Sequence, residues 1–292
     1  MTTALAPTPD AGRSPRARGA RPAPGARPLG SGSGVGLGVA VLWMSLIVLI
    51  PLAAVVGKAF GGGWGGFWSA ITDREARTAL TLTASLAFGV AVLNAVMGTV
   101  VAWVLARDQF RGKWLLELVI DIPFALPTIV AGLVMLTLYG KNSPVGIHLV
   151  GTRVGLFVAL MFVTLPFTVR TVQPVLLDLD RDVEQAAASL GASPLTTFRR
   201  IILPPILPAV VSGSALSFAR ALGEYGSLVL ISSNIPFKTQ IASSIIYGKL
   251  QDAQDPVHAV RAASAIAVVL LVASLVVLVV LDVVQRVVAR RS

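Results

Sequence analysis

Residues 183–208 read VEQAAASLGASPLTTFRRIILPPILP and form the longest polar interval in an otherwise apolar chain. The alanine-rich segment Val183–Leu190 predicts a short helix, because alanine has the highest helix propensity. Gly191 can take the left-handed conformation that ends a helix, and Ser193 followed by Pro194 is typical of a helix start. We therefore expect a helix-turn-helix, and the three prolines of residues 203–208 predict a break or kink where it enters the next apolar run.

The composition indicates a polytopic membrane protein. The 292 residues are 55% hydrophobic and 13% charged, against about 25% charged in soluble domains. The chain has no cysteine and only two histidines, His148 and His258, far apart in sequence. We therefore expect no disulfide, no metal site and no catalytic cysteine. The net charge of +10 could suit nucleic acid, but the basic residues lie at the ends of apolar runs, so no nucleic-acid partner is expected.

Six apolar stretches are long enough to cross a bilayer, which takes about 20 residues in a helix. They cover residues 36–57, 79–106, 114–139, 154–172, 206–232 and 262–284. We predict an all-α polytopic membrane protein with six transmembrane helices. Residues 1–34, rich in Pro, Gly, Ala, Ser and Arg, predict a disordered cytoplasmic tail. Residues 35–74 would hold the first helix and an outer loop, and residues 75–285 a transmembrane domain with a cytoplasmic loop at 173–205.

The distribution of basic residues predicts the orientation in the membrane. Of the 24 Lys and Arg residues, fifteen fall on the side of the N-terminus and eight on the other side. Cytoplasmic segments carry the excess of positive charge in membrane proteins. We therefore expect a multi-pass protein of the cell membrane with both termini, and the polar interval of residues 183–208, in the cytoplasm. The outer GGGWGGFW segment (61–68) predicts an anchor among lipid headgroups.

Two charged residues, Arg220 and Glu224, lie well inside the fifth predicted span. At about 100° per residue they share one narrow stripe of a helix with Gly213, Ser217 and Ser227. A charged side chain in lipid costs several kcal/mol, so the stripe must face protein or a water-filled pathway. Two interpretations stay open: a structural ion pair between helices, or a role in lining or gating a solute pathway.

A polar stripe in a helical membrane protein suggests transport, and the chain has no means of its own to use ATP. The phosphate-binding pattern G-x-x-x-x-G-K-[ST] does not occur in it, and that pattern cradles the phosphates in many pumps. We therefore expect no enzyme activity and no cofactor in this chain. A partner ATPase would bind ATP and Mg²⁺, and the cytoplasmic helix-turn-helix is its natural docking site.

The same segment resembles the binding-protein-dependent ABC transporter permeases. Their cytoplasmic loop has the form E-A-A, three residues, G, nine residues, I-x-L-P, and this chain matches it at Ala186, Ala187, Gly191, Ile201, Leu203 and Pro204. Gln185 stands where the family has Glu, and Glu184 precedes it. The resemblance implies an ABC importer permease (MetI-like) architecture, with Ala186, Ala187 and Gly191 seated in a groove of the ATPase. Gln185 predicts a contact that depends on shape more than on charge.

Four further stretches are similar to the sulfate/thiosulfate T-type permease branch. They are IPFALPTIVAGL (122–133), LYGKNSPVG (138–146), SFARALGEYGS (217–227) and NIPFKTQIAS (234–243). The resemblance implies ATP-driven sulfate import by alternating access. The implied partners are a sister W-type permease, a cytoplasmic ATPase dimer and an extracytoplasmic sulfate-binding protein. On this interpretation Arg220 would have a transient or gating role toward the anion.

Two alternatives remain. A molybdate or tungstate permease would carry a related motif in the fifth span, because both of these anions are also tetrahedral. A stand-alone secondary transporter or channel belongs to another class of protein. It would need coupling acids in its pathway and would have no use for the cytoplasmic helix-turn-helix.

Overall fold

The computed structural model describes residues 31–252 and 254–289, and every regular element in these ranges is a helix. The chain divides into two units, residues 1–50 and residues 51–292. The predicted disordered tail, residues 1–34, lies almost entirely outside the described residues. The first helix already begins at Ser31, a few residues before the predicted end of that tail.

The first described segment is a continuous helix built from α1 (Ser31–Met44), the π-helical turn η1 (Ser45–Leu49) and α2 (Ile50–Ala59). Its apolar side chains are exposed on all sides through residues 34–50. A helix that is apolar all round is typical of a membrane span. Residues 34–59 are long and apolar enough to be one, which agrees with the first predicted span.

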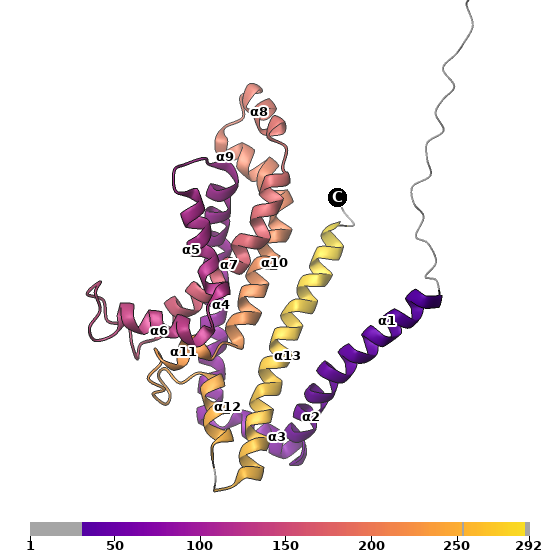
Figure 1. Ribbon diagram of the computed structural model, residues 1–292, viewed down its shortest axis with the longest axis vertical. Coiled ribbons are helices and arrows are strands. Elements are labelled where there is room, and N and C mark those ends of the chain that lie inside the picture. The colour runs from indigo at the N-terminus through magenta and orange to yellow at the C-terminus, as the bar shows by residue number, and fades with distance from the viewer. Residues whose placement is uncertain (1–30, 253, 290–292) are drawn as a thin grey trace, which may run out of the picture. The chain divides into compact units, whose positions relative to one another are not determined.

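The second unit continues with four long helices, α4, α7, α10 and α13, and several short ones. Their order is α3 (Gly63–Thr72), α4 (Arg74–Arg107), α5 (Lys113–Ala125), α6 (Thr128–Tyr139), α7 (Arg153–Asp178), α8 (Arg181–Ser189), α9 (Pro194–Thr197), η2 (Phe198–Ile202), α10 (Leu203–Leu222), α11 (Gly226–Val229), α12 (Ala242–Leu250) and α13 (Pro256–Ala289). Helices α4, α7 and α10 pack side by side, with α13 against α10 (Figure 1). Figure 1 shows α8 at one end of this bundle, with α3 and α12 at the other.

The two larger core clusters of the second unit lie around α4, α7 and α10. One contains Val90, Leu156 and Leu222, and the other, nearer α8, contains Leu105 and Ile206; all five are fully buried. Lipid tails are as apolar as leucine, so the hydrophobic effect does little to join these helices inside a bilayer. Close packing and interhelical hydrogen bonds therefore decide their association.

Five helices of the described residues are long and apolar enough to cross a membrane, and a bent pair would make a sixth. The bent pair corrects the prediction of one continuous span at residues 114–139. Helix α5 ends at Ala125, α6 begins at Thr128, and the two meet at an angle of 119°. Leu126 has an extended backbone, because a residue before proline is driven out of the helical conformation.

The fifth predicted span, residues 206–232, also needs correction. The helix begins at Pro194, runs to Leu222, and stops ten residues before the predicted end. Pro204 and Pro205 do not break it. The preceding π-helical turn η2 lets the N–H of Leu203 donate to the carbonyl oxygen of Phe198, five residues back. A wider turn of this kind accommodates residues that lack an N–H donor.

The loop predicted at residues 173–205 is shorter in the structure. Helix α7 continues to Asp178 with Pro166 and Pro174 inside it, and the helix of α9, η2 and α10 starts at Pro194. The segment between them contains α8 and its two short connections. We call this segment, together with α9 and Phe198, the hairpin (residues 179–198).

Candidate functional site

The hairpin has the local structure that its sequence predicts. Asp180 caps the start of α8 by accepting a hydrogen bond from the N–H of Asp182. Gly191 has a left-handed backbone with φ of +81°. The hydroxyl of Ser193 accepts from the N–H of Thr196 at the start of α9. The predicted short helix, left-handed glycine and Ser-Pro helix start are therefore confirmed.

The eight residues predicted for ATPase coupling differ in exposure. Gln185, Ala186, Gly191 and Pro204 are exposed, whereas Glu184, Ile201 and Leu203 are half-buried and Ala187 is buried inside the hairpin. Two further exposed residues of the hairpin, Leu190 and Leu195, were not among those predicted for ATPase coupling. Their side chains are 88% and 64% exposed at the end of the bundle. The signal was available, because each is a large apolar residue within the polar interval.

Glu184 already has a partner within the chain. Its carboxylate forms an ion pair with Arg107, the last residue of α4. The Arg107 side chain is 9% exposed and that of Glu184 is 24% exposed. The structure therefore places Glu184 at the foot of the hairpin, against α4, rather than on the outer surface beside Gln185.

The intramembrane charges lie at a break in the fifth span. Helix α10 ends at Leu222, so Arg220 is in its last turn, while Glu224 and Ser227 lie beyond its end. The prediction of one continuous helical stripe is wrong for these last two residues. Nη1 of Arg220 lies 2.6 Å from Oε2 of Glu224, so the two residues form an ion pair at the end of α10. A role of this pair in a solute pathway stays a prediction.

The two partners of this ion pair have different surroundings. The Glu224 side chain is 1% exposed, and its Oε1 accepts hydrogen bonds from both the N–H and the hydroxyl of Ser227, at 2.9 and 3.0 Å. The carbonyl oxygen of Glu224 accepts from the hydroxyl of Ser243. The Arg220 side chain is 34% exposed. Glu224 is thus the fixed member of the pair, and Arg220 is the charge that a solute could reach.

The other two predicted stripe residues, Gly213 and Ser217, pack against α7. A Cβ at Gly213 would lie 2.7 Å from the Cα of Thr168. The buried hydroxyl of Ser217 donates to the carbonyl oxygen of Thr164 at 2.9 Å and lies 3.2 Å from the hydroxyl of Thr168. These contacts hold α10 closely to α7, so both residues have a packing role in this structure.

Asn94 extends the same polar contact to α4. Its side-chain N–H donates to the hydroxyl of Thr164 at 2.9 Å, and that hydroxyl donates to the carbonyl oxygen of Leu160. All three bundle helices are therefore joined through one buried set of hydrogen bonds. Such bonds between membrane helices contribute about 0.6–2 kcal/mol each.

The two breaks in the spans meet each other. Helix α11, just beyond Glu224, packs on α6, just beyond Pro127. The approach is close enough to require glycine on both sides. A Cβ at Gly132 would lie 2.8 Å from the carbonyl oxygen of Ser227, and one at Gly226 would lie 2.2 Å from Oγ1 of Thr128. The Arg220–Glu224 pair thus lies beside a contact between two irregular membrane segments.

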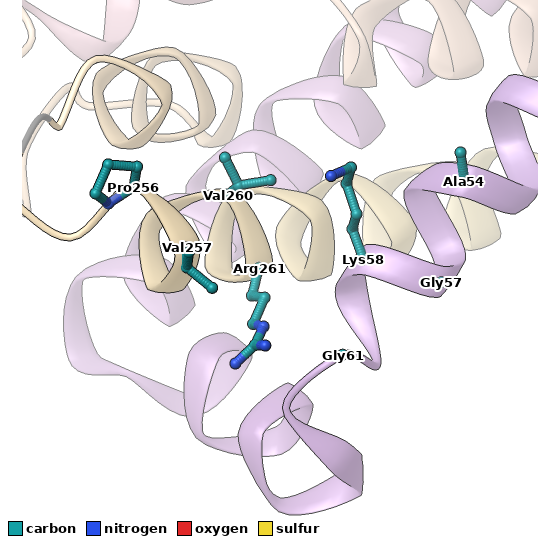
Figure 2. Close-up of a pocket in the computed structure, with 8 residues that line it drawn as sticks. All are labelled: Ala54, Gly57, Lys58, Gly61, Pro256, Val257, Val260 and Arg261. Carbon is teal, nitrogen blue, oxygen red and sulfur yellow. The ribbon is translucent and has the colours of Figure 1, made fainter.

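A separate cleft of about 510 Å³ lies at the opposite end of the bundle from the hairpin. It is lined by Ala54, Gly57, Lys58, Gly61, Pro256, Val257, Val260 and Arg261 (Figure 2). Arg261 lies over Gly61, where a Cβ would come within 3.3 Å of its Nε. Figure 2 shows Lys58 and Arg261 pointing away from each other, so the two cations do not converge on one ligand.

Comparison with known proteins places these features in a family. Residues 96–292 match the family described as binding-protein-dependent transport system inner membrane component. The sulfate transport system permease protein CysT of Synechocystis is 45% identical over 232 residues, which are 77% of this chain and 81% of that protein. The protein of the same name from Salmonella typhimurium is 41% identical over 236 residues, 78% and 83% of the two chains.

Solved structures share the fold at low sequence identity. A bacterial ABC transporter for import of the acidic polysaccharide alginate matches with a TM-score of 0.69 at 16% identity, covering 85% of this chain and 94% of that one. The MetNI methionine ABC transporter, in inward-facing conformations, matches with a TM-score of 0.56 at 18% identity, covering 72% and 94%. These likenesses support the all-helical fold of ABC importer permeases for this chain.

Proposed function

Because this chain belongs to the family of binding-protein-dependent transport system inner membrane components, we propose that it is the sulfate-conducting subunit of an ATP-driven importer. The observation that supports sulfate as the substrate is the 41–45% identity of this chain to sulfate transport system permeases over more than three quarters of its length. The chain itself is a membrane-embedded permease subunit.

The proposed complex contains a sister W-type permease, a cytoplasmic ATPase dimer and an extracytoplasmic sulfate-binding protein. The ATPase would bind ATP and Mg²⁺, since the chain lacks the phosphate-binding pattern. The exposed Leu190 and Leu195 support a docked partner at the hairpin, because exposed apolar side chains grouped outside a membrane mark interaction sites. In the proposed orientation both termini and the hairpin lie in the cytoplasm. The excess of basic residues on that side favours this arrangement.

The coupling mechanism follows from how the hairpin is attached. Helix α9 continues through η2 into α10 without a break, so a displacement of the hairpin is passed along one rigid helix. That helix ends at Leu222, between the two members of the Arg220–Glu224 pair and just before the contact of α11 with α6. Closure of the ATPase dimer on ATP would move the hairpins and open the pathway outward, and hydrolysis would reset it inward.

Arg220 is the residue of this chain that we expect to meet the anion. A guanidinium that is one-third exposed offers a dianion a favourable charge inside a low-dielectric region. Its partner Glu224 lowers the net charge of the pair, which prevents tight binding that would stop release. We therefore assign Arg220 a transient contact with the passing anion rather than a role in a tight binding site.

Uptake of labelled sulfate tests the proposal in a strain that lacks its own sulfate permeases and carries this gene with its partner genes. We expect uptake that requires the ATPase and that excess molybdate does not abolish. Uptake of molybdate in preference to sulfate would instead support the molybdate or tungstate permease. Uptake that persists without the ATPase would support a stand-alone secondary transporter.

A further inference from the structure

The ion pair between Arg107 and Glu184 joins two segments that are 77 residues apart in sequence. Arg107 ends α4, and Glu184 lies in α8 of the hairpin. Both side chains are largely buried. A charge in such a place is tolerated only when it is paired, since breaking the pair leaves the remaining charge buried without compensation. The contact therefore fixes α8 to the end of α4.

A second contact ties the hairpin to the same end of α4. The side chain of Arg181 donates to the carbonyl oxygen of Arg107 at 3.3 Å. The last carbonyls of a helix have no partner within it, so a cation at this position also compensates the negative end of the helix. Both charged residues of α8 that face α4 thus contact its final turn.

The other arm of the hairpin reaches the same place through aromatic rings. The guanidinium carbon of Arg107 lies 5.8 Å from the centre of the Trp103 ring. Trp103 packs edge to face against Phe198 of η2, with ring centres 5.8 Å apart. The two arms of the hairpin therefore meet α4 at Arg107 and at Trp103, which contact each other in its last turns.

Helix α4 connects this point with the far end of the bundle. It is 34 residues long, or about 51 Å at 1.5 Å per residue. Asn94 joins it to α7 halfway along, and near its other end Thr83 accepts a hydrogen bond from the N–H of Ala242, at the start of α12. Figure 1 shows α12 at the opposite end of the bundle from α8. A movement of the hairpin can thus be passed along α4 to the opposite end of the bundle.

We propose that the Arg107–Glu184 pair is a positioning contact that passes hairpin movement to α4. In this role Glu184 makes a contact within this chain, and its exposed neighbours in α8 contact the ATPase. This inference rests on the proposed ATP-driven import. It adds a second route of coupling to the continuous helix of α9, η2 and α10.

The test uses the whole complex in proteoliposomes and measures ATP hydrolysed per anion taken up. The variants are Arg107→Gln, Glu184→Gln and the charge swap R107E/E184R, with Arg111→Gln as an exposed basic control in the adjoining loop. We expect both single variants to bind the ATPase and hydrolyse ATP, while the ratio rises about fivefold, as for residues in a coupling network. The swap should restore the ratio, and Arg111→Gln should leave it unchanged.

Three outcomes would overturn the inference. Loss of ATPase binding in Glu184→Gln would show that Glu184 contacts the partner directly. An unchanged ratio in both single variants would show that the pair carries no coupling. Loss of the single variants from the membrane, with normal levels and a normal ratio in the swap, would leave only a structural role. The wild-type complex tests the proposed function separately, and the ratio can be measured with whichever oxyanion it transports.

Discussion

A guanidinium nitrogen of Arg220 lies 2.6 Å from a carboxylate oxygen of Glu224, although helix α10 ends at Leu222 between the two residues. The pair therefore bridges a helix and the irregular segment that follows it. Glu224 is held by Ser227 and is almost fully buried, whereas Arg220 is one-third exposed. This asymmetry predicts different consequences for the two substitutions.

Replacing Arg220 by Ala should leave assembly and basal ATP hydrolysis intact, because the buried Glu224 carboxylate keeps its two hydrogen bonds from Ser227, and should abolish transport. The physical reason is the loss of the only charge of the pair that a solute can reach. We expect labelled sulfate uptake to fall by about tenfold or more, which corresponds to a barrier higher by about 1.4 kcal/mol. Failure of Arg220→Ala to assemble would instead identify a structural ion pair. Arg220→Lys, which keeps the charge, provides the comparison.

Glu224→Ala should destabilise the protein more than Ser227→Ala. Truncating a buried ion-pair partner costs about 3–5 kcal/mol, and the partial exposure of Arg220 should reduce this to about 2–3 kcal/mol by solvent screening. Ser227→Ala removes one hydroxyl donor, at a cost of about 1 kcal/mol. The check is the melting temperature of the purified chain in detergent. Equal melting temperatures for the two variants would contradict the assigned role of Glu224.

Gly226→Ala should be far more harmful than Gly223→Ala, three residues earlier. A Cβ at Gly226 would lie 2.2 Å from Oγ1 of Thr128 and 3.0 Å from the backbone nitrogen of Ile129, whereas at Gly223 nothing lies within 4 Å. Overpacking of this kind costs about 1–3 kcal/mol. Both variants would be compared by melting temperature and by sulfate uptake. A Gly223→Ala variant as damaged as Gly226→Ala would show that flexibility at the break, rather than close approach, is what matters.

Leu190→Asp should weaken binding of the ATPase without unfolding the chain. Its side chain is 88% exposed at the tip of the hairpin, so a charge there costs little in the free subunit but is buried on docking. Loss of a central apolar contact in an interface costs about 2 kcal/mol or more. Co-purification of the ATPase measures the effect. Leu250→Asp, also exposed but at the other end of the bundle, should bind the ATPase normally.

The hairpin was predictable because its signals are local. A left-handed turn at Gly191 and a capped helix start at Ser193 depend on a few neighbouring residues, and the structure has both. The ion pair of Glu184 with Arg107 was not predictable in the same way. Its members are 77 residues apart, and no pattern in either segment specifies the other.

The breaks in the spans show why hydropathy alone was insufficient. An apolar stretch of the right length satisfies the lipid whether the helix within it is straight or bent. Pro127 marks a sharp break, yet Pro166 and Pro174 lie inside the continuous helix α7, and Pro204 is accommodated beside a π-helical turn. The fold class and the positions of the apolar stretches were thus predictable, while the course of the third and fifth predicted spans was not.

The π-helical turn at residues 198–202 has a geometric consequence for the whole molecule. It inserts one residue into a helix whose residues otherwise follow at about 100°. The angular phase between the hairpin and the intramembrane part of α10 is therefore set by this turn and not by the identity of any side chain. Deleting one residue there would rotate the ATPase-facing surface about the helix axis by roughly that angle. A single-residue change in length could thus redirect which partner face the hairpin meets, while the intramembrane packing of Ser217 stays as it is.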